Sequence, residues 1–148
     1  MIRVLVVCLG NICRSPIGEG LLRSQGQNRG LDLFVDSAGT MGWHAGKAPD
    51  HRSQGVMRAH GLDISSQQSR PMELEDFQKF DVILCMDQQN LTDVLKMAKG
   101  PAHVQLFVAG KDVPDPYYGG DAGFEAVYSM LDSAASNWIN NWMTNSNS

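Results

Sequence analysis

The stretch from residue 2 to residue 16 constrains the fold more than any other part of the chain. Residues 2–7 are apolar apart from one arginine, which predicts a buried parallel strand that ends at Cys8. A tight glycine–asparagine turn follows, and the pair Ser15 and Pro16 is typical of the start of a helix. A loop between a strand and a helix can point several backbone N–H groups inward, where the helix dipole adds positive potential. The sequence therefore predicts a cradle for an oxyanion at Cys8.

Two side chains of this loop indicate its chemistry. Amides that bind an oxyanion also stabilise a thiolate, so we expect Cys8 to ionise easily. The planar guanidinium of Arg14 can hold two phosphate oxygens at once, which a lysine could not do. A thiolate beside a bound phosphate ester could attack it and give a thiophosphate intermediate, which water then hydrolyses.

Composition limits the class of protein. The 148 residues are enough for one domain with one core, and 43% hydrophobic and 19% charged residues are ordinary for a soluble globular protein. A net charge of −4 argues against nucleic acid as a partner, and no apolar stretch approaches the roughly 20 residues of a membrane span. The N-terminal apolar run is too short for a signal peptide, and the three cysteines form no CxxC pair. We therefore expect a cytoplasmic protein with reduced thiols and with no metal or cofactor.

Strand patterns alternate with helical patterns, which predicts an α/β fold. We expect a single three-layer domain in which helices flank a parallel sheet of about four strands, with a phosphate-binding loop after the first strand. This domain is expected over residues 1–143, followed by a polar, frayed tail over residues 144–148. The expected strands are residues 2–7, 31–35, 80–86 and 104–108, and the expected helices are residues 15–28, 50–60, 72–79, 88–99 and 121–142.

Some finer features are also predicted. Loops are expected over residues 36–49 and 65–71, and Asp87 and Asp121 are expected to cap the helices that follow them. The glycines of the first helix, Gly18 and Gly20, indicate a close backbone approach. Helical spacing predicts that one face of the helix over residues 88–99 carries Leu91, Val94, Leu95 and Ala98.

Ligands of such a sheet bind outside the carboxyl ends of the strands. The departing oxygen of a phosphate ester needs a proton there, so the site requires an acid. Four aspartates are candidates for this acid by their position after expected strands: Asp36, Asp87, Asp112 and Asp115.

Residues 8–15, with the sequence Cys-Leu-Gly-Asn-Ile-Cys-Arg-Ser, resemble the C-x5-R-S phosphate loop of the low-molecular-weight protein tyrosine phosphatases. The Asp-Pro-Tyr sequence at residues 115–117 is similar to the second signature of that family, and the resemblance runs from Ile2 to about Trp142. It implies hydrolysis of phosphotyrosine through a Cys8 thiophosphate, with Asp115 as the general acid. It also implies a phosphotyrosine-containing protein as substrate and the binding of phosphate or another oxyanion in the site. We expect a monomer that could self-associate weakly.

The resemblance further implies the residues that surround the reaction. Ser37 joins Asn11 and Ser15 in a polar network that supports the loop, whereas Ser66 stands where many relatives have a histidine. Cys13 is a candidate redox partner of Cys8. Some relatives have an exposed tyrosine that can be phosphorylated at the position of Tyr118, but we expect Tyr118 to be packed. Cys85 lies within an apolar strand pattern, so we expect an inert core thiol. A slot that accepts a flat aromatic ring has Trp43 and Tyr117 as its walls. The residues that contact the substrate are then Leu9, Gly10, Asn11, Ile12, Cys13, Ser15, Trp43 and Tyr117.

Three other functions remain open. An arsenate reductase has this fold and loop but carries further cysteines in a flexible segment, whereas only Cys85, within an expected strand, remains here. A protein arginine phosphatase resembles this chain except for a threonine where Ile12 stands. The third is a protein without catalysis, either an anion-binding module or a redox sensor. The presence of Cys8, Arg14 and Asp115 together argues against it, since binding alone needs neither a thiolate nor an acid.

Overall fold

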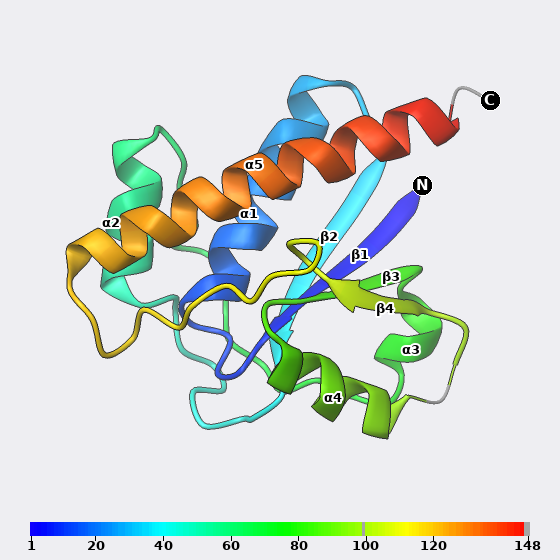
Figure 1. The fold of residues 1–148 in the computed structure, drawn as a ribbon, viewed down its shortest axis with the longest axis horizontal. Helices are drawn as coiled ribbons and strands as arrows, with labels where there is room; N and C mark the ends of the chain where they lie inside the picture. Colours follow the sequence, from blue (N-terminus) through cyan, green and yellow to red (C-terminus); the bar gives the residue numbers. More distant parts are fainter. Residues whose placement is uncertain (99, 147–148) are drawn as a thin grey trace.

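The computed structural model describes residues 1–98 and 100–146. Strands and helices alternate along the chain, as Figure 1 shows. In order, the elements are β1 (Ile2–Cys8), α1 (Arg14–Asn28), β2 (Leu33–Gly39), α2 (His51–Ala59), α3 (Asp76–Lys79), β3 (Val82–Cys85), α4 (Gln88–Met97), β4 (His103–Leu106) and α5 (Asp121–Ser146).

The four strands form one parallel sheet with the order β2-β1-β3-β4, which confirms the predicted fold class. The strand β1 is central, because it pairs with β2 on one side and with β3 on the other. Cys8 at its end lies opposite Gly39, and Val7 lies opposite Cys85. The loops after three strands therefore meet at one edge of the sheet, where the cradle was expected.

The residues of β1 alternate between two cores. Val4 and Val6 belong to the core formed with α1, α2 and α5, whereas Leu5 and Val7 belong to the core formed with α3 and α4. Figure 1 shows these two groups of helices on opposite sides of the sheet. Burial on both faces explains why residues 4–7 are a continuous apolar run rather than an alternating pattern. The three layers were predicted from the alternation of strand and helix patterns.

The helix α1 lies close to the sheet at Gly18. A Cβ atom there would lie 2.9 Å from Met86 Cε and 3.1 Å from Val6 Cγ1. At Gly20 a Cβ atom would lie 2.7 Å from Ile64 Cγ2. These contacts confirm that the glycines permit a close approach, which brings the N-terminus of α1 against the end of β1.

The second strand differs from its prediction. It begins at Leu33 and continues to Gly39, so residues 36–39, expected to be a loop, are strand. Asp36, Ser37 and Ala38 pair with residues 5–7 of β1, because ladder hydrogen bonds use the backbone and do not require apolar side chains. Leu31 is not in the strand, since its N–H group donates to Gly26 O at the end of α1.

The third and fourth helices also differ. Residues 72–75 do not join α3, because the N–H of Met72 donates to Gly39 O and the N–H of Glu73 donates to Asp76 Oδ2. In α4, Val94 is buried but Leu95 is 54% exposed. Leu95 lies about 100° around the helix from Val94, which takes it beyond the buried stripe. Ala98 is exposed as well, and Lys99 lies outside the described residues.

The ends of the remaining elements moved by a few residues. The strand β3 covers Val82–Cys85 rather than 80–86, and β4 covers His103–Leu106 rather than 104–108. Asp121 lies within α5 instead of capping it, and the helix continues to residue 146, so residues 144–146 are not a frayed tail. Residues 147–148 lie outside the described residues, and the domain over residues 1–143 stays a prediction. Within residues 1–98 and 100–146, no helix combines the length and apolar character that crossing a bilayer requires.

Candidate active site

The loop between β1 and α1 bends around the sulfur of Cys8. Asn11 has a φ of 59°, in the left-handed region that asparagine tolerates better than most residues. This turn directs the Asn11 N–H group at Cys8 Sγ, 3.3 Å away. Ser15 Oγ, in the first turn of α1, lies 3.1 Å from the same sulfur. Cys8 is 2% exposed, so its sulfur lies at the bottom of the loop with polar hydrogens directed at it.

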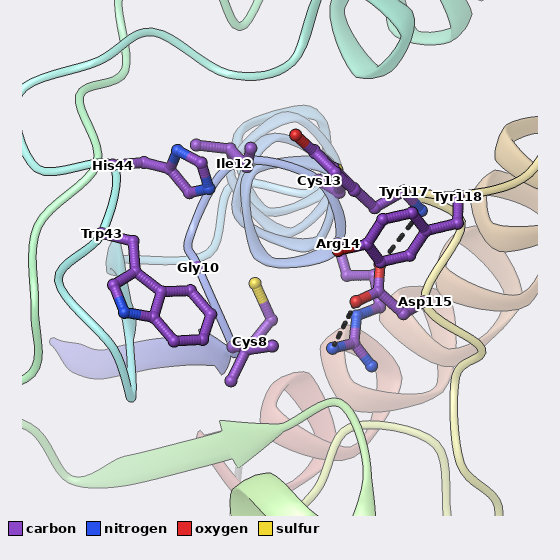
Figure 2. Close-up of a pocket in the computed structure, with 11 residues that line it drawn as sticks. Cys8, Gly10, Ile12, Cys13, Arg14, Trp43, His44, Asp115, Tyr117 and Tyr118 are labelled. Carbon is purple, nitrogen blue, oxygen red and sulfur yellow. Dashed lines mark hydrogen bonds and ion pairs between the residues drawn. The ribbon is translucent and has the colours of Figure 1, made fainter.

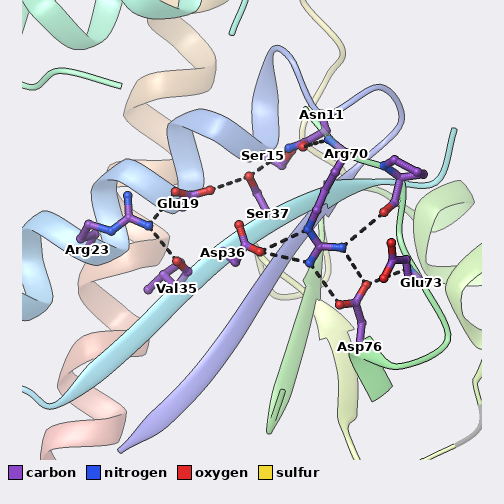
Figure 3. A network of polar contacts seen from close by, with 11 residues as sticks. Asn11, Ser15, Glu19, Arg23, Val35, Asp36, Ser37, Arg70, Glu73 and Asp76 are labelled. Carbon is purple, nitrogen blue, oxygen red and sulfur yellow. Dashed lines mark hydrogen bonds and ion pairs between the residues drawn. The ribbon is translucent and has the colours of Figure 1, made fainter. Parts of the chain in front are cut away.

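A chain of hydrogen bonds with a defined direction supports this arrangement (Figure 3). The Ser37 hydroxyl donates to Glu19 Oε1 over 2.6 Å, and Ser37 Oγ accepts from Asn11 Nδ2 over 2.9 Å. Asn11 Nδ2 also donates to Ser15 Oγ over 2.7 Å. The Ser15 hydroxyl proton is then available to a Cys8 thiolate, which can only accept. The structure thus brings together Asn11, Ser15 and Ser37 as predicted.

Two members of this network were not predicted. Glu19 is 4% exposed, and burial raises its pKa, although hydrogen bonds from Ser37 and Arg23 oppose that rise. An acidic residue between two glycines on a helix face that packs on the sheet was the signal in the sequence. Arg70 is the second member: its N–H group donates to Asn11 Oδ1 over 3.0 Å, and its guanidinium pairs with Asp36 and Asp76.

Ser66, which stands where many relatives have a histidine, is exposed. The next residue, Gln67, donates to Pro16 O over 3.1 Å. The amide orientation of Asn11 is fixed instead by the Arg70 N–H group, so the network does not depend on a side chain at position 66.

Arg14 is buried beside the sulfur. Its Nη1 lies 2.6 Å from Asp87 Oδ2 and 2.9 Å from Val113 O, and its Nη2 lies 3.8 Å from Asp115 Oδ2. Burial alone would lower the pKa of Arg14, but the negative charges of Cys8 and Asp87 raise it. The guanidinium is therefore a fixed cation. Asp87 caps α4 as predicted, since Asn90 N donates to its Oδ1 over 2.8 Å, and its bond to Arg14 is a second role that was not predicted.

The surroundings of the four candidate acids differ. Asp36 pairs with Arg70, Asp87 pairs with Arg14, and Asp112 accepts from Gln88 N. Asp115 is the one of these four that lines the pocket over Cys8. Its side chain is 39% exposed, its Oδ1 accepts from Tyr117 N over 3.1 Å, and its Oδ2 is the oxygen that lies near Arg14.

The pocket above the loop has a volume of about 250 Å³. Figure 2 shows Trp43 and Tyr117 on opposite sides of it, with the sulfur of Cys8 between them. His44, which was not predicted as a site residue, also lines the pocket, and its ring centroid lies 6.4 Å from that of Tyr117. Tyr118 is 94% exposed at the rim, so its expected packing is wrong. The lining residues are Cys8, Leu9, Gly10, Ile12, Cys13, Arg14, Trp43, His44, Asp115, Tyr117 and Tyr118.

The other two cysteines are protonated thiols. Burial raises the pKa of Cys13 to about 12, and the nearby charges of Asp50 and Cys8 add to this rise. Burial also raises the pKa of Cys85 to about 12, in agreement with an inert core thiol. Among the described residues, no three histidine, cysteine or acidic side chains gather as metal ligands would.

The chain is similar to known proteins in both sequence and structure. A family model described as low molecular weight phosphotyrosine protein phosphatase matches residues 3–147. The human low molecular weight phosphotyrosine protein phosphatase is 43% identical over 138 residues, which cover 86% of this chain and 87% of the human protein. A crystal structure of a protein tyrosine phosphatase from Entamoeba histolytica, with Hepes in the active site, superposes with a TM-score of 0.92 at 36% identity and covers 99% of both chains. A Drosophila arginine phosphatase superposes with a TM-score of 0.91 at 32% identity, covering 95% of this chain and 98% of that one. The chain therefore belongs to the low-molecular-weight protein tyrosine phosphatases, a family of phosphoric monoester hydrolases.

Proposed function

We propose that this chain hydrolyses phosphotyrosine in proteins, with Cys8 as the nucleophile and Asp115 as the general acid. The observation that carries the proposal is that Cys8, Arg14 and Asp115 line one pocket with aromatic walls. Binding of an anion alone would use Arg14 and the backbone amides, but it would need neither a thiol nor an acid. Family membership supports the same reaction class.

The reaction proceeds in two steps. In the first, the Cys8 thiolate attacks phosphorus, the bond between phosphorus and the tyrosine oxygen breaks, and Asp115 donates its proton to that oxygen. In the second, water attacks phosphorus and returns a proton to Asp115, the sulfur–phosphorus bond breaks, and phosphate leaves. Arg14 and the loop amides stabilise the negative charge on the phosphoryl oxygens in both steps. The Ser15 hydroxyl, 3.1 Å from Cys8 Sγ, stabilises the departing thiolate.

The shape of the pocket supports an aryl phosphate as substrate. A phosphate at Cys8 lies at the base of the slot between Trp43 and Tyr117, and an aromatic ring spans the distance to the opening. The side chain of phosphoserine is too short to bridge it. The substrate we propose is therefore a phosphotyrosine residue on a protein surface, bound by a monomer of this chain. We propose a cytoplasmic location, because all three cysteines are free thiols.

Phosphoarginine hydrolysis is the second candidate function. The similarity to a Drosophila arginine phosphatase supports it, and Ile12, the position that differs from that group, lines the pocket. The isoleucine methyl groups offer no hydrogen bond to a guanidinium, which favours phosphotyrosine. Arsenate reduction has less support, because Cys85 is buried in β3 and cannot reach the pocket without unfolding of the strand.

Two variants test the proposal. Cys8→Ser should bind a phosphotyrosine peptide without turnover. Asp115→Asn should lower kcat/KM for the same peptide by roughly 10²–10⁴-fold, and by much less for p-nitrophenyl phosphate, whose leaving group needs little protonation. Asp112→Asn is the matched control, since this neighbouring aspartate lies outside the pocket. Equal losses on both substrates would remove Asp115 from the role of acid, and turnover by Cys8→Ser near the wild-type rate would remove Cys8 from the mechanism.

A further inference from the structure

The segment that carries Asp115 has no regular secondary structure, so its position depends on individual contacts. Before Asp115, the segment is fixed at Val113, which is fully buried. The N–H group of Val113 donates to Met86 O over 2.8 Å, and its carbonyl accepts from Arg14. This contact fixes the start of the segment but leaves the direction of Asp115 to the residues that follow.

The residues after Asp115 form a compact turn. The Tyr117 N–H group donates to Asp115 Oδ1 over 3.1 Å, a contact that is drawn in Figure 2. The Gly119 N–H group donates to Pro116 O over 2.9 Å and closes the turn. The carboxylate of Asp115 is thus tied to the backbone of the turn, and it moves if the turn moves.

Arg52, near the start of α2, contacts the turn of residues 115–119 from outside. Its Nη2 donates to Tyr117 O over 2.9 Å, and its Nη1 donates to Gly119 O over 3.1 Å. The guanidinium also lies over the ring of Phe124 at 4.6 Å and near that of Tyr117 at 5.6 Å. A single planar group therefore contacts the exit of the turn through two carbonyls and two rings.

The same guanidinium is anchored to the cradle. Arg52 binds both oxygens of Asp50, with Nε to Oδ1 and Nη2 to Oδ2, each over 3.0 Å. The Asp50 N–H group donates to Ile12 O over 2.8 Å, within the phosphate loop. The hydroxyl of Ser53, one residue after Arg52, donates to Cys13 O over 3.1 Å. The first turn of α2 therefore links the loop that holds the phosphate to the turn that holds the acid.

We propose that Arg52 is a positioning residue for the general acid. It fixes the distance between the turn of residues 115–119 and the phosphate loop, so that the carboxyl of Asp115 faces the leaving oxygen of a phosphate bound at Cys8. A misplacement of about 1 Å at a reacting group can cost on the order of 10²-fold in rate, so a loose turn should slow proton transfer specifically. This inference rests on the proposed function, because it assigns a partner to the acid named there.

The test uses the dependence of rate on the leaving group. We expect Arg52→Ala to lower kcat/KM for a phosphotyrosine peptide by roughly 10- to 100-fold, which is part of the general-acid contribution. For p-nitrophenyl phosphate the loss should be no more than about threefold, since that substrate depends little on the acid. For Arg52→Lys, kcat/KM for the phosphotyrosine peptide should lie between the values of the wild type and of Arg52→Ala, because one ammonium cannot bind Asp50 and both carbonyls together. Arg58→Ala, at an exposed arginine of the same helix, is the matched control and should leave both rates unchanged.

A double variant separates positioning from general stabilisation. If Arg52 acts through Asp115, adding Arg52→Ala to Asp115→Asn should cause no further loss on the phosphotyrosine peptide. Equal losses of Arg52→Ala on both substrates, or full additivity in the double variant, would overturn the inference. If Arg52→Ala does not fold, the ratio of the losses of Arg52→Lys on the phosphotyrosine peptide and on p-nitrophenyl phosphate decides. If neither variant folds, Arg52 is a structural residue and the inference is wrong.

The failure of this inference can be told apart from the failure of the proposed function. If Asp115→Asn shows no preference between the two substrates, the general acid is misassigned and the proposed function is at fault. If Asp115→Asn behaves as expected while Arg52→Ala behaves like Arg58→Ala, only the role of Arg52 is wrong.

Discussion

Substitution of Asn11 separates the contribution of the loop backbone from that of the polar network. Asn11 is 2% exposed and makes three side-chain hydrogen bonds, to Ser15 Oγ, to Ser37 Oγ and from the Arg70 N–H group. It also has a positive φ of 59°. Glycine at this position keeps the backbone geometry and removes the bonds, whereas alanine removes the bonds and adds backbone strain.

The magnitudes follow from these contacts. Each lost hydrogen bond costs about 1 kcal/mol, so Asn11→Gly should lower the free energy of unfolding by about 2–4 kcal/mol. Both serine hydroxyls keep another partner, Cys8 for Ser15 and Glu19 for Ser37, which limits the loss. Left-handed geometry costs about 1–2 kcal/mol for a residue with a Cβ atom, part of which is offset by the greater entropy of unfolded glycine. Asn11→Ala should therefore be less stable than Asn11→Gly by about 1 kcal/mol.

Activity gives a second measurement on the same variants. Without the Asn11 amide, the Ser15 hydroxyl is free to rotate away from Cys8 Sγ, so the departing thiolate loses a donor and kcat for a phosphotyrosine peptide should fall. Urea unfolding gives the stabilities, and Asn140→Ala, at an exposed asparagine, is the control. The reasoning is refuted if Asn11→Gly and Asn11→Ala are equally stable and both lie within 1 kcal/mol of wild type, a loss smaller than that of one buried hydrogen bond.

Three further predictions concern other residues of the site. Burial raises the pKa of Glu19 above its ordinary value of 4.5, so the folded chain holds this proton more tightly and stability should fall as the pH rises from 4.5 through the raised pKa. In Glu19→Gln, this contribution to the loss of stability with rising pH should disappear, as measured by urea unfolding at several pH values. An unchanged pH dependence of the free energy of unfolding would contradict the raised pKa of Glu19. Peroxide should inactivate the wild type reversibly, with recovery in dithiothreitol, whereas Cys13→Ser should recover poorly because no disulfide can protect Cys8. Burial raises the pKa of Cys13 to about 12, so disulfide formation between Cys13 and oxidised Cys8 should accelerate at alkaline pH. Full recovery of the Cys13→Ser variant would make Cys13 purely structural. Ile12→Thr should raise the ratio of phosphoarginine to phosphotyrosine turnover, and an unchanged ratio would show that position 12 does not set specificity.

The fold was predictable where residue pattern and packing agree. The apolar run at residues 4–7 identified a strand buried on both faces, and the structure gives it that place. Residues 36–39 escaped prediction because their pairing with β1 is a long-range backbone contact that leaves no periodic signal. The prediction that Leu95 lies on the buried face of α4 was wrong for a related reason. Contacts with the sheet, and not the composition of α4, decide which stripe of the helix is buried.

The candidate site followed the same rule. Cys8, Arg14 and Asp115 were found because local motifs carry them, and the structure brings all three to one pocket. Arg70 and Arg52 act through partners 59 and 67 residues away in the sequence, so no local pattern could indicate them. Glu19 had a local signal in its position between two glycines, but its partner Ser37 is 18 residues away. Asp87 shows both cases, since its capping role is local and its bond to Arg14 joins residues 73 positions apart.

The central place of β1 also determines when activity can arise during synthesis. Arg14 and the Val113 carbonyl that holds it are separated by 99 residues. At a rate of about 5–20 residues per second, roughly 5–20 s pass between the synthesis of the two. Until residue 85 has been made, the nascent chain carries the Cys8 thiol and an apolar strand whose partner β3 is incomplete. The thiol is then an ordinary cysteine without its network. A nascent chain arrested before residue 113 should therefore have no phosphatase activity and should expose Cys8 to alkylation at the rate of an unfolded peptide.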